Sequence, residues 1–259
     1  MTRENRDQLL FDAIATQYAR KDIALSSALA RKNQLATAMR LIPQENGQWG
    51  TIVDVGCGIG APAKYLHGQY QRYIGIDQSP EMIEAAIVFN RDHPQATFLA
   101  DNIKETQLPR NTADVILSVG ALHHMSDLDK VMESLAAIAK PGAALVVIEP
   151  QNANPLIQMM RWIRGLIDKG YSREQVFFSE AELADLFNRH GISHMQIRYE
   201  GYVTTPFAQV IASSNAVLAA FSKLAIQVDN WLQNHLRGPL QRLSFNIIIT
   251  GLFPTRNEV

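Results

Sequence analysis

At residues 53–60 the chain reads Val53-Asp54-Val55-Gly56-Cys57-Gly58-Ile59-Gly60. The apolar, β-branched residues before the glycines are typical of a buried strand, and residues 61–67 have helical character. Glycines between a strand and a helix allow a tight turn, and they let a ligand approach the backbone closely. The first N–H groups of the helix have no partner within it and can bind that ligand. This stretch therefore predicts a strand, a ligand-binding loop and a helix.

Short apolar runs alternate with helical segments from this stretch onward. The runs typical of buried strands lie at residues 51–55, 73–76, 96–100, 114–118 and 143–148. The helical segments between them lie at residues 61–67, 80–90 and 128–139. Strands that alternate with helices form parallel sheets, and the helices cover both faces. The pattern therefore predicts a doubly wound α/β fold.

The flanking regions are mostly helical by pattern. Apolar residues recur at three- and four-residue steps in residues 8–41, which predicts two helices. Residues 207–236 predict one amphipathic helix or a pair of them. The other elements expected after residue 150 are helices at 154–167 and 180–190 and strands at 194–202 and 245–250. With these two strands the expected sheet has seven.

Composition narrows the class of protein. The chain has 259 residues, of which 47% are hydrophobic, so a sizeable core is expected. Its net charge is −1, so no general electrostatic attraction to nucleic acid is expected. Its one cysteine, Cys57, can form neither an internal disulfide nor a thiolate metal cluster, and no metal is expected. No apolar run resembles a signal peptide or a membrane span of about 20 residues. We expect a cytoplasmic protein.

Three acidic residues lie at the ends of predicted strands. Asp77 follows the glycines by about 20 residues, where a carboxylate accepts hydrogen bonds from ribose hydroxyls. The glycine spacing alone also fits a dinucleotide-binding loop. However, Asp54 lies beside the loop, where its charge would repel a pyrophosphate and suit a cationic nucleoside such as S-adenosylmethionine. Asp101 can accept a hydrogen bond from an adenine amino group, or it is a surface turn residue.

Taken in order, these segments resemble the class I, Rossmann-like S-adenosylmethionine-dependent methyltransferases, of the kind that act on small molecules. The resemblance covers residues 51–150. Its motifs are residues 53–60, Gly75-Ile76-Asp77-Gln78-Ser79-Pro80-Glu81-Met82, Ala100-Asp101-Asn102, Ala113-Asp114-Val115-Ile116-Leu117-Ser118, Leu122-His123-His124-Met125 and Lys140-Pro141-Gly142-Ala143. The ordered set is far more specific than any one motif. It implies a mostly parallel seven-stranded sheet with an antiparallel last strand.

The resemblance also implies a single domain in which three consecutive segments have different roles. Residues 1–45 would form an N-terminal helical lid, residues 50–150 the cofactor-binding core, and residues 151–259 the substrate-side helices and final strands, with a helical insertion before the last strand. S-adenosylmethionine would be the cofactor. The residues implied to bind it are Asp54, Gly56, Cys57, Gly58, Gly60, Asp77, Gln78, Met82, Asp101, Asn102 and Ser118.

Four residues are candidates for the acceptor side of the site. His123 and His124 follow the fourth strand, where a neutral imidazole can take a proton from an acceptor hydroxyl. The same pair is also compatible with a local helix start, with Asp127 as the cap. Glu149 ends the fifth strand and is either a substrate contact or a solvated loop acid. Tyr18 is either part of a lid over the sulfonium, through cation–π attraction, or a half-buried helix residue.

Two further segments are compatible with more than one binding partner. Arg161, Arg164, Lys169 and Arg173 flank apolar residues, which is typical of a solvated basic face and compatible with peripheral membrane contact or an acidic substrate. Residues 207–236 are compatible with a lid over an apolar substrate pocket, a homodimer face or a packed helix. Their apolar content favours a small hydrophobic or lipid-like methyl acceptor, and we prefer oxygen as the methylated atom.

Three rival functions are weighed against methyl transfer. An NAD(P)-dependent oxidoreductase would need a second nucleotide-binding half and a hydride-transfer site, and no Tyr-x-x-x-Lys pair is recognisable. A non-catalytic nucleoside-binding module would keep the fold without turnover. A nucleic-acid methyltransferase would need a basic track and stacking aromatics, whereas the fourth strand ends in Ser118-Val119-Gly120-Ala121.

Overall fold

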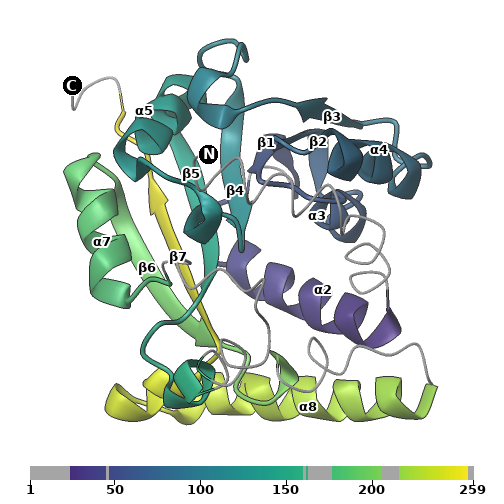
Figure 1. The fold of residues 1–259 in the computed structure, drawn as a ribbon, viewed down its shortest axis with the longest axis vertical. Coiled ribbons are helices and arrows are strands. Elements are labelled where there is room, and N and C mark those ends of the chain that lie inside the picture. Colours follow the sequence, from purple (N-terminus) through teal and green to yellow (C-terminus); the bar gives the residue numbers. More distant parts are fainter. Residues whose placement is uncertain (1–23, 45–46, 160–161, 163–176, 206–215, 256–259) are drawn as a thin grey trace.

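The computed structural model of this chain describes residues 24–44, 47–159, 162, 177–205 and 216–255. These residues form a seven-stranded sheet in the order β3-β2-β1-β4-β5-β7-β6 (Figure 1). The strands are β1 (Trp49–Val55), β2 (Tyr70–Asp77), β3 (Ala96–Ala100), β4 (Ala113–Val119), β5 (Ala139–Pro150), β6 (Ser193–Glu200) and β7 (Asn246–Leu252). The pairs from β3 to β5 are parallel, and β7 runs antiparallel to both neighbours. The predicted doubly wound, mostly parallel sheet with an antiparallel last strand is confirmed.

The central strands are buried on both faces because their side chains alternate between two cores. Val53 and Val55 of β1 pack into one core, together with residues of α5 (Leu128–Ile138) and α7 (Glu180–Arg189). Ile52 packs into the other core, with residues of α2 (Leu25–Met39) and α3 (Ala61–Tyr65). A strand whose consecutive residues face two apolar layers reads as a continuous apolar run, which is the pattern that the sequence shows.

The helices begin where side chains cap them. Ser79 accepts a hydrogen bond from the Met82 N–H at the start of α4 (Pro80–Phe89). Ser179 and Glu182 form a reciprocal capping box at α7. Asp127 caps α5 through the Lys130 N–H, as the sequence allowed. Short 3-10 turns complete the layer: η1 (Ile103–Glu105), η2 (Leu122–His124) and η4 (Gly238–Leu243).

The helical insertion before β7 is a single helix over its described part. This helix, α8 (Ala216–His235), crosses the lower edge of the molecule and packs against α2 (Figure 1). The first of the two predicted N-terminal helices lies outside the described residues, and α2 corresponds to the second. No helix in the described part of the chain is long and apolar enough to cross a membrane.

Candidate functional site

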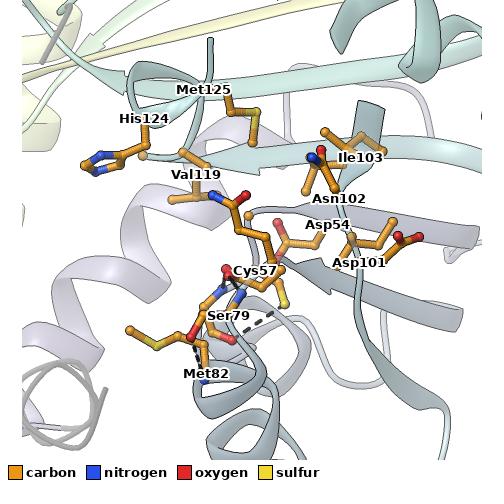
Figure 2. A pocket seen from close by; sticks show the side chains of 18 of the residues that line it. Asp54, Cys57, Ser79, Met82, Asp101, Asn102, Ile103, Val119, His124 and Met125 are labelled. Carbon is orange, nitrogen blue, oxygen red and sulfur yellow. Dashed lines mark hydrogen bonds between the residues drawn. The ribbon is translucent and has the colours of Figure 1, made fainter. Parts of the chain in front are cut away.

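A pocket opens at the carboxyl ends of the parallel strands, on the β1–β2–β4 side of the sheet (Figure 2). The loops after β1, β2, β3 and β4 all contribute to its wall, because the carboxyl ends of parallel strands meet at one edge. The predicted cofactor residues that line it are Asp54, Gly56, Cys57, Gly58, Asp77, Gln78, Met82, Asp101 and Asn102. Residues from three separate motifs of the sequence therefore meet in one cavity.

Two glycines of the loop after β1 have different spatial roles. Both Gly58 and Gly60 have positive φ angles, of 51° and 65°. A Cβ atom on Gly58 would meet no atom within 4 Å, since this glycine faces the open pocket. A Cβ atom on Gly60 would lie 2.4 Å from the ring of Phe98 and 2.9 Å from Asn90 Nδ2. Gly58 therefore leaves room for a ligand, whereas Gly60 leaves room for the neighbouring strand and helix.

Asp77 links the ends of β1 and β2. Its Oδ2 accepts a hydrogen bond from the Gly58 N–H at 2.9 Å, and its Oδ1 accepts one from the Ser79 N–H at 3.0 Å. Each carboxylate oxygen has a second lone pair, so the group can also accept bonds from a ligand. Asp77 therefore holds the glycine loop in place and still has acceptor capacity for ribose hydroxyls.

Asp54 is the buried acid of the pocket, with a relative exposure of 1%. Its Oδ2 accepts a hydrogen bond from the Tyr73 hydroxyl, and burial keeps that donor protonated by raising the pKa of Tyr73. Its Oδ1 is buried and has no hydrogen-bond partner among the described residues. Burial raises the pKa of Asp54 to about 7, against the lowering effect of the Tyr73 hydrogen bond. A cationic ligand group beside Oδ1 would satisfy this oxygen and favour its ionised form.

Cys57 is a buried thiol in the loop after β1. Burial raises the pKa of the Cys57 thiol well above its ordinary value, so the group stays a thiol at neutral pH. Its Sγ contacts the Gly58 carbonyl oxygen at 3.6 Å. In the described ranges, His, Cys, Asp and Glu side chains form no cluster of three or more that could hold a metal ion.

The loops after β2 and β3 form the side of the pocket that is expected to face adenosine. The Asp101 N–H donates to the Asp77 carbonyl oxygen at 3.0 Å, which joins the two loops. Asn102 Oδ1 accepts from the Lys104 N–H at 3.1 Å and caps η1. Met82 is buried against Ile59, so its side chain forms an apolar wall. In Figure 2, Asp101 and Asn102 lie on one flank of the pocket, away from Met82.

His123 and His124 are placed differently. His124 lines the pocket beside Met125, on the opposite side from Ser79 and Met82 (Figure 2). His123 is not one of the lining residues among those described, and its Nδ1 lies 2.6 Å from Glu149 Oε2. The two rings are in contact, with centroids 4.0 Å apart. Only His124 is therefore in position to reach a ligand in this pocket.

Glu149 lies behind the pocket wall, fully buried at the end of β5. Besides the contact with His123, its Oε1 accepts hydrogen bonds from the Ala121 and Leu122 N–H groups at 3.0 and 2.7 Å. The carboxylate therefore fixes the turn after β4 to the end of β5. It is not a solvated loop acid, and the described pocket wall does not include it.

Two other predicted residues, Ser118 and Gly60, lie away from the described wall. Ser118 is fully buried in β4, its Oγ has no partner among the described residues, and the adjacent Val119 lines the pocket instead. Gly60 packs against Phe98 of β3. Tyr18 lies outside the described residues, as do Arg161, Arg164, Lys169 and Arg173.

Arg31 of α2 lines the pocket, and sequence reasoning did not identify it. Its guanidinium donates to Gln34 Oε1 at 2.9 Å, and Gln34 in turn donates to the buried Glu200 at 2.9 Å. The positive charge of Arg31 acts to lower the pKa of both Asp54 and Glu200, although burial dominates and raises each to about 7. No local pattern marks Arg31, because only the packing of α2 over the sheet brings it to the pocket.

Comparison with known proteins identifies relatives of this arrangement. Residues 53–147 match the family described as "Methyltransferase domain". The chain is similar to a 2-methyl-6-phytyl-1,4-hydroquinone methyltransferase of Synechocystis sp., with 29% identity over 74% of this chain and 62% of that protein. It is also similar to a trans-aconitate 2-methyltransferase of Escherichia fergusonii, with 27% identity over 56% of this chain and 58% of the relative. The chain thus spans less than two thirds of the length of these relatives.

A solved structure shares the fold of nearly the whole chain. It is a S-adenosylmethionine-dependent methyltransferase from Thermotoga maritima, with a TM-score of 0.66 and 18% identity, and the match covers 93% of this chain and 97% of that one. The match therefore extends beyond the cofactor-binding core to the elements on either side of it.

Proposed function

We propose that the chain transfers the methyl group of S-adenosylmethionine to a small hydrophobic acceptor, because residues 53–147 match the methyltransferase-domain family and the chain is similar to a hydroquinone methyltransferase. The observation that carries the cofactor assignment is the buried Asp54 Oδ1, which lacks a partner among the described residues and lines the pocket. A buried polar atom without a partner is costly, and a cationic ligand group offsets that cost. A dinucleotide pyrophosphate would add an anion beside the same carboxylate. The oxidoreductase alternative is therefore set aside.

The residues of the pocket fit S-adenosylmethionine by their chemistry. Asp54 suits its positively charged methionine end, and the guanidinium of Arg31 in the same wall suits its carboxylate. Asp77 suits the ribose hydroxyls, and Met82 supplies apolar surface for the adenine ring. When bound, the cofactor supplies a methyl group on a sulfonium, which is already activated for displacement. The chain therefore needs to orient the acceptor and exclude water.

One observation supports a hydrophobic acceptor, and a second supports oxygen as the methylated atom. The Synechocystis relative acts on a hydroquinone with a phytyl chain, and its match extends over 206 residues, well beyond the cofactor-binding core. His124 lines the pocket, and a neutral imidazole there can receive the proton of an acceptor hydroxyl. A general base of this kind raises the reaction rate by about 10²–10⁴-fold. The rate of methyl transfer therefore depends mainly on the alignment of the acceptor with the methyl group and the sulfur. We therefore assign a prenylated phenol or quinol as the acceptor class.

Separate measurements test the identity of the cofactor, the occurrence of methyl transfer and the class of the acceptor. Calorimetry with S-adenosylmethionine and with NAD is expected to show binding of the first alone. Labelled methyl transfer is then measured with a prenylated hydroquinone, with the same hydroquinone lacking the prenyl chain, and with trans-aconitate. We expect transfer to the prenylated compound to be the fastest. Preferred methylation of trans-aconitate would refute the acceptor class. Cofactor binding without transfer to any fraction of a cell extract would favour the non-catalytic module.

A further inference from the structure

Helix α8 carries an exposed apolar stripe on the side that does not pack against α2. Phe221, Leu224, Val228 and Trp231 recur at steps of three and four residues, which places them on one helix face. Leu224 and Trp231 are both 56% exposed. The side toward the protein is marked by the buried residues Ser222, Ala225 and Asp229. We refer to Phe221, Leu224, Val228 and Trp231 as the α8 stripe.

The apolar surface continues beyond the end of α8. Leu240 and Leu243 of the following turn, η4, are also exposed, at 52% and 46%. Asn154 donates to the Leu243 carbonyl oxygen at 2.8 Å, which ties η4 to a segment that exposes Leu156 and Met159. Large apolar side chains on neighbouring segments mark interaction surfaces rather than scattered exposure.

The charges of this region have one sign. Between residues 216 and 243 the acidic residue is Asp229, which is buried and accepts hydrogen bonds from the Val203 and Thr204 N–H groups. The cations of the same segment, Lys223, Arg237 and Arg242, are exposed. The chain as a whole has a net charge of −1, so this segment is more positively charged than the chain on average. An apolar helix face with exposed cations and no exposed acid is complementary to an anionic lipid surface.

We propose that the α8 stripe, together with the exposed cations Lys223, Arg237 and Arg242 of the same segment, docks this protein on an anionic membrane surface. A second copy of the chain is a poorer occupant. A two-fold contact would bring α8 against α8, and the cations of each copy would face cations without an acid from the same segment. Helix α8 packs against α2 (Figure 1), and α2 contributes Arg31 to the pocket. The docking surface is thus one helix layer from the pocket wall.

Vesicle binding tests this surface without requiring turnover, so it can fail independently of the proposed function. The full chain is sedimented with phosphatidylcholine vesicles and with vesicles that also contain phosphatidylglycerol. We expect at least about tenfold stronger binding to the anionic vesicles, since each cation near the surface adds about fivefold. The Leu224→Gln/Trp231→Gln variant is expected to lose about tenfold or more of that binding.

Two further variants make the result specific. Ile87→Gln/Val88→Gln changes exposed apolar residues on α4 and is expected to bind vesicles like the unchanged protein. Lys223→Gln/Arg237→Gln is expected to lose the preference for anionic lipid. Because it changes only exposed cations, this variant still tests the docking surface if the stripe variant unfolds. S-adenosylmethionine binding serves as the folding control for each. Absence of binding to anionic vesicles, equal binding by all variants, or a dimer that the stripe variant dissociates would overturn the proposal.

Discussion

The Tyr73 hydroxyl donates a hydrogen bond to Asp54 Oδ2, while Asp54 Oδ1 lies buried without a partner among the described residues. The two residues sit on adjacent strands, since Asp54 is paired with Gly75 and Tyr73 with Ile52. The bond fixes the orientation of the carboxyl group and leaves its second oxygen for a ligand. Burial nevertheless raises the pKa of Asp54 to about 7. The charge state of this group is therefore expected to change near neutral pH.

The first prediction is a pH dependence of cofactor affinity. In the free protein Asp54 is protonated below pH 7, because its pKa is raised to about 7. A cationic ligand group beside it favours the ionised form, so binding releases a proton. Affinity for S-adenosylmethionine is then expected to rise by about tenfold for each pH unit up to pH 7 and to level off above it. Titration calorimetry between pH 5 and about 8 measures this slope.

The control for that slope is Asp54→Asn. The amide keeps the shape of the side chain but carries no titratable proton, so affinity is expected to be weak and nearly independent of pH below 7. A variant that retains the slope of the unchanged protein would assign the titration to another group. Glu200 is the nearest rival, since burial also raises its pKa to about 7, and Glu200→Gln is expected to keep the slope.

A second prediction concerns Asp77. Removal of its carboxylate in Asp77→Ala is expected to weaken S-adenosylmethionine binding by about 1–3 kcal/mol, the cost of losing hydrogen bonds to a charged group. The Gly58 and Ser79 N–H groups lose their acceptor as well, so the glycine loop is expected to loosen. Asp114→Ala is the comparison, because that carboxylate accepts from the Thr51 N–H on the same sheet but does not line the pocket. Equal affinities in the two variants would contradict the assignment.

The local parts of this site could be predicted from the sequence, because neighbours in the chain build them. The loop after β1 follows from a strand, glycines and a helix in direct succession. Asp77 and Asp101 follow from their places at strand ends. The burial of Glu149 could not be predicted in this way. It is buried because β5 has β4 on one side and β7 on the other, and the β7 pairing joins residues about a hundred positions apart.

The remaining errors have the same origin. Ser118 is among the residues expected to bind the cofactor, but the alternation along β4 turns its side chain into the core and leaves Val119 at the pocket. Arg31 was missed because α2 reaches the pocket only through tertiary packing. The Asp54–Tyr73 pair depends on the register of β1 and β2, which the spacing of apolar residues does not specify.

A third prediction uses two glycines as a matched pair. Gly58 and Gly68 both have positive φ angles, 51° and 83°, and a Cβ atom on either would meet nothing within 4 Å. Alanine at either position is expected to cost about 1–2 kcal/mol of stability from backbone strain. Only Gly58 lines the pocket, so only Gly58→Ala is expected to weaken cofactor binding as well. Thermal unfolding and calorimetry separate these effects, and an equal loss of affinity in Gly68→Ala would show that strain alone is responsible.

The last prediction separates Glu149 from His124, which lie on either side of His123. Glu149→Ala leaves the Ala121 and Leu122 N–H groups buried without their acceptor, and each such group costs about 1–3 kcal/mol. This variant is expected to lower the unfolding free energy and, by releasing the turn after β4, the turnover rate. His124→Ala is expected to lower the turnover rate with little effect on stability, because its partly exposed ring lines the pocket.

Denaturant unfolding and turnover of both variants decide between the two roles. If His124 receives the acceptor proton, its loss lowers kcat by about 10²-fold or more and removes the imidazole step from the pH profile. If His124 only shapes the wall, His124→Gln restores the rate, because an amide fills similar space without acting as a base. Glu149→Gln retains an acceptor oxygen for the two N–H groups, so it is expected to recover more stability than rate. A Glu149→Ala variant as stable as the unchanged protein would contradict the positioning role, because the buried N–H groups would then need no acceptor.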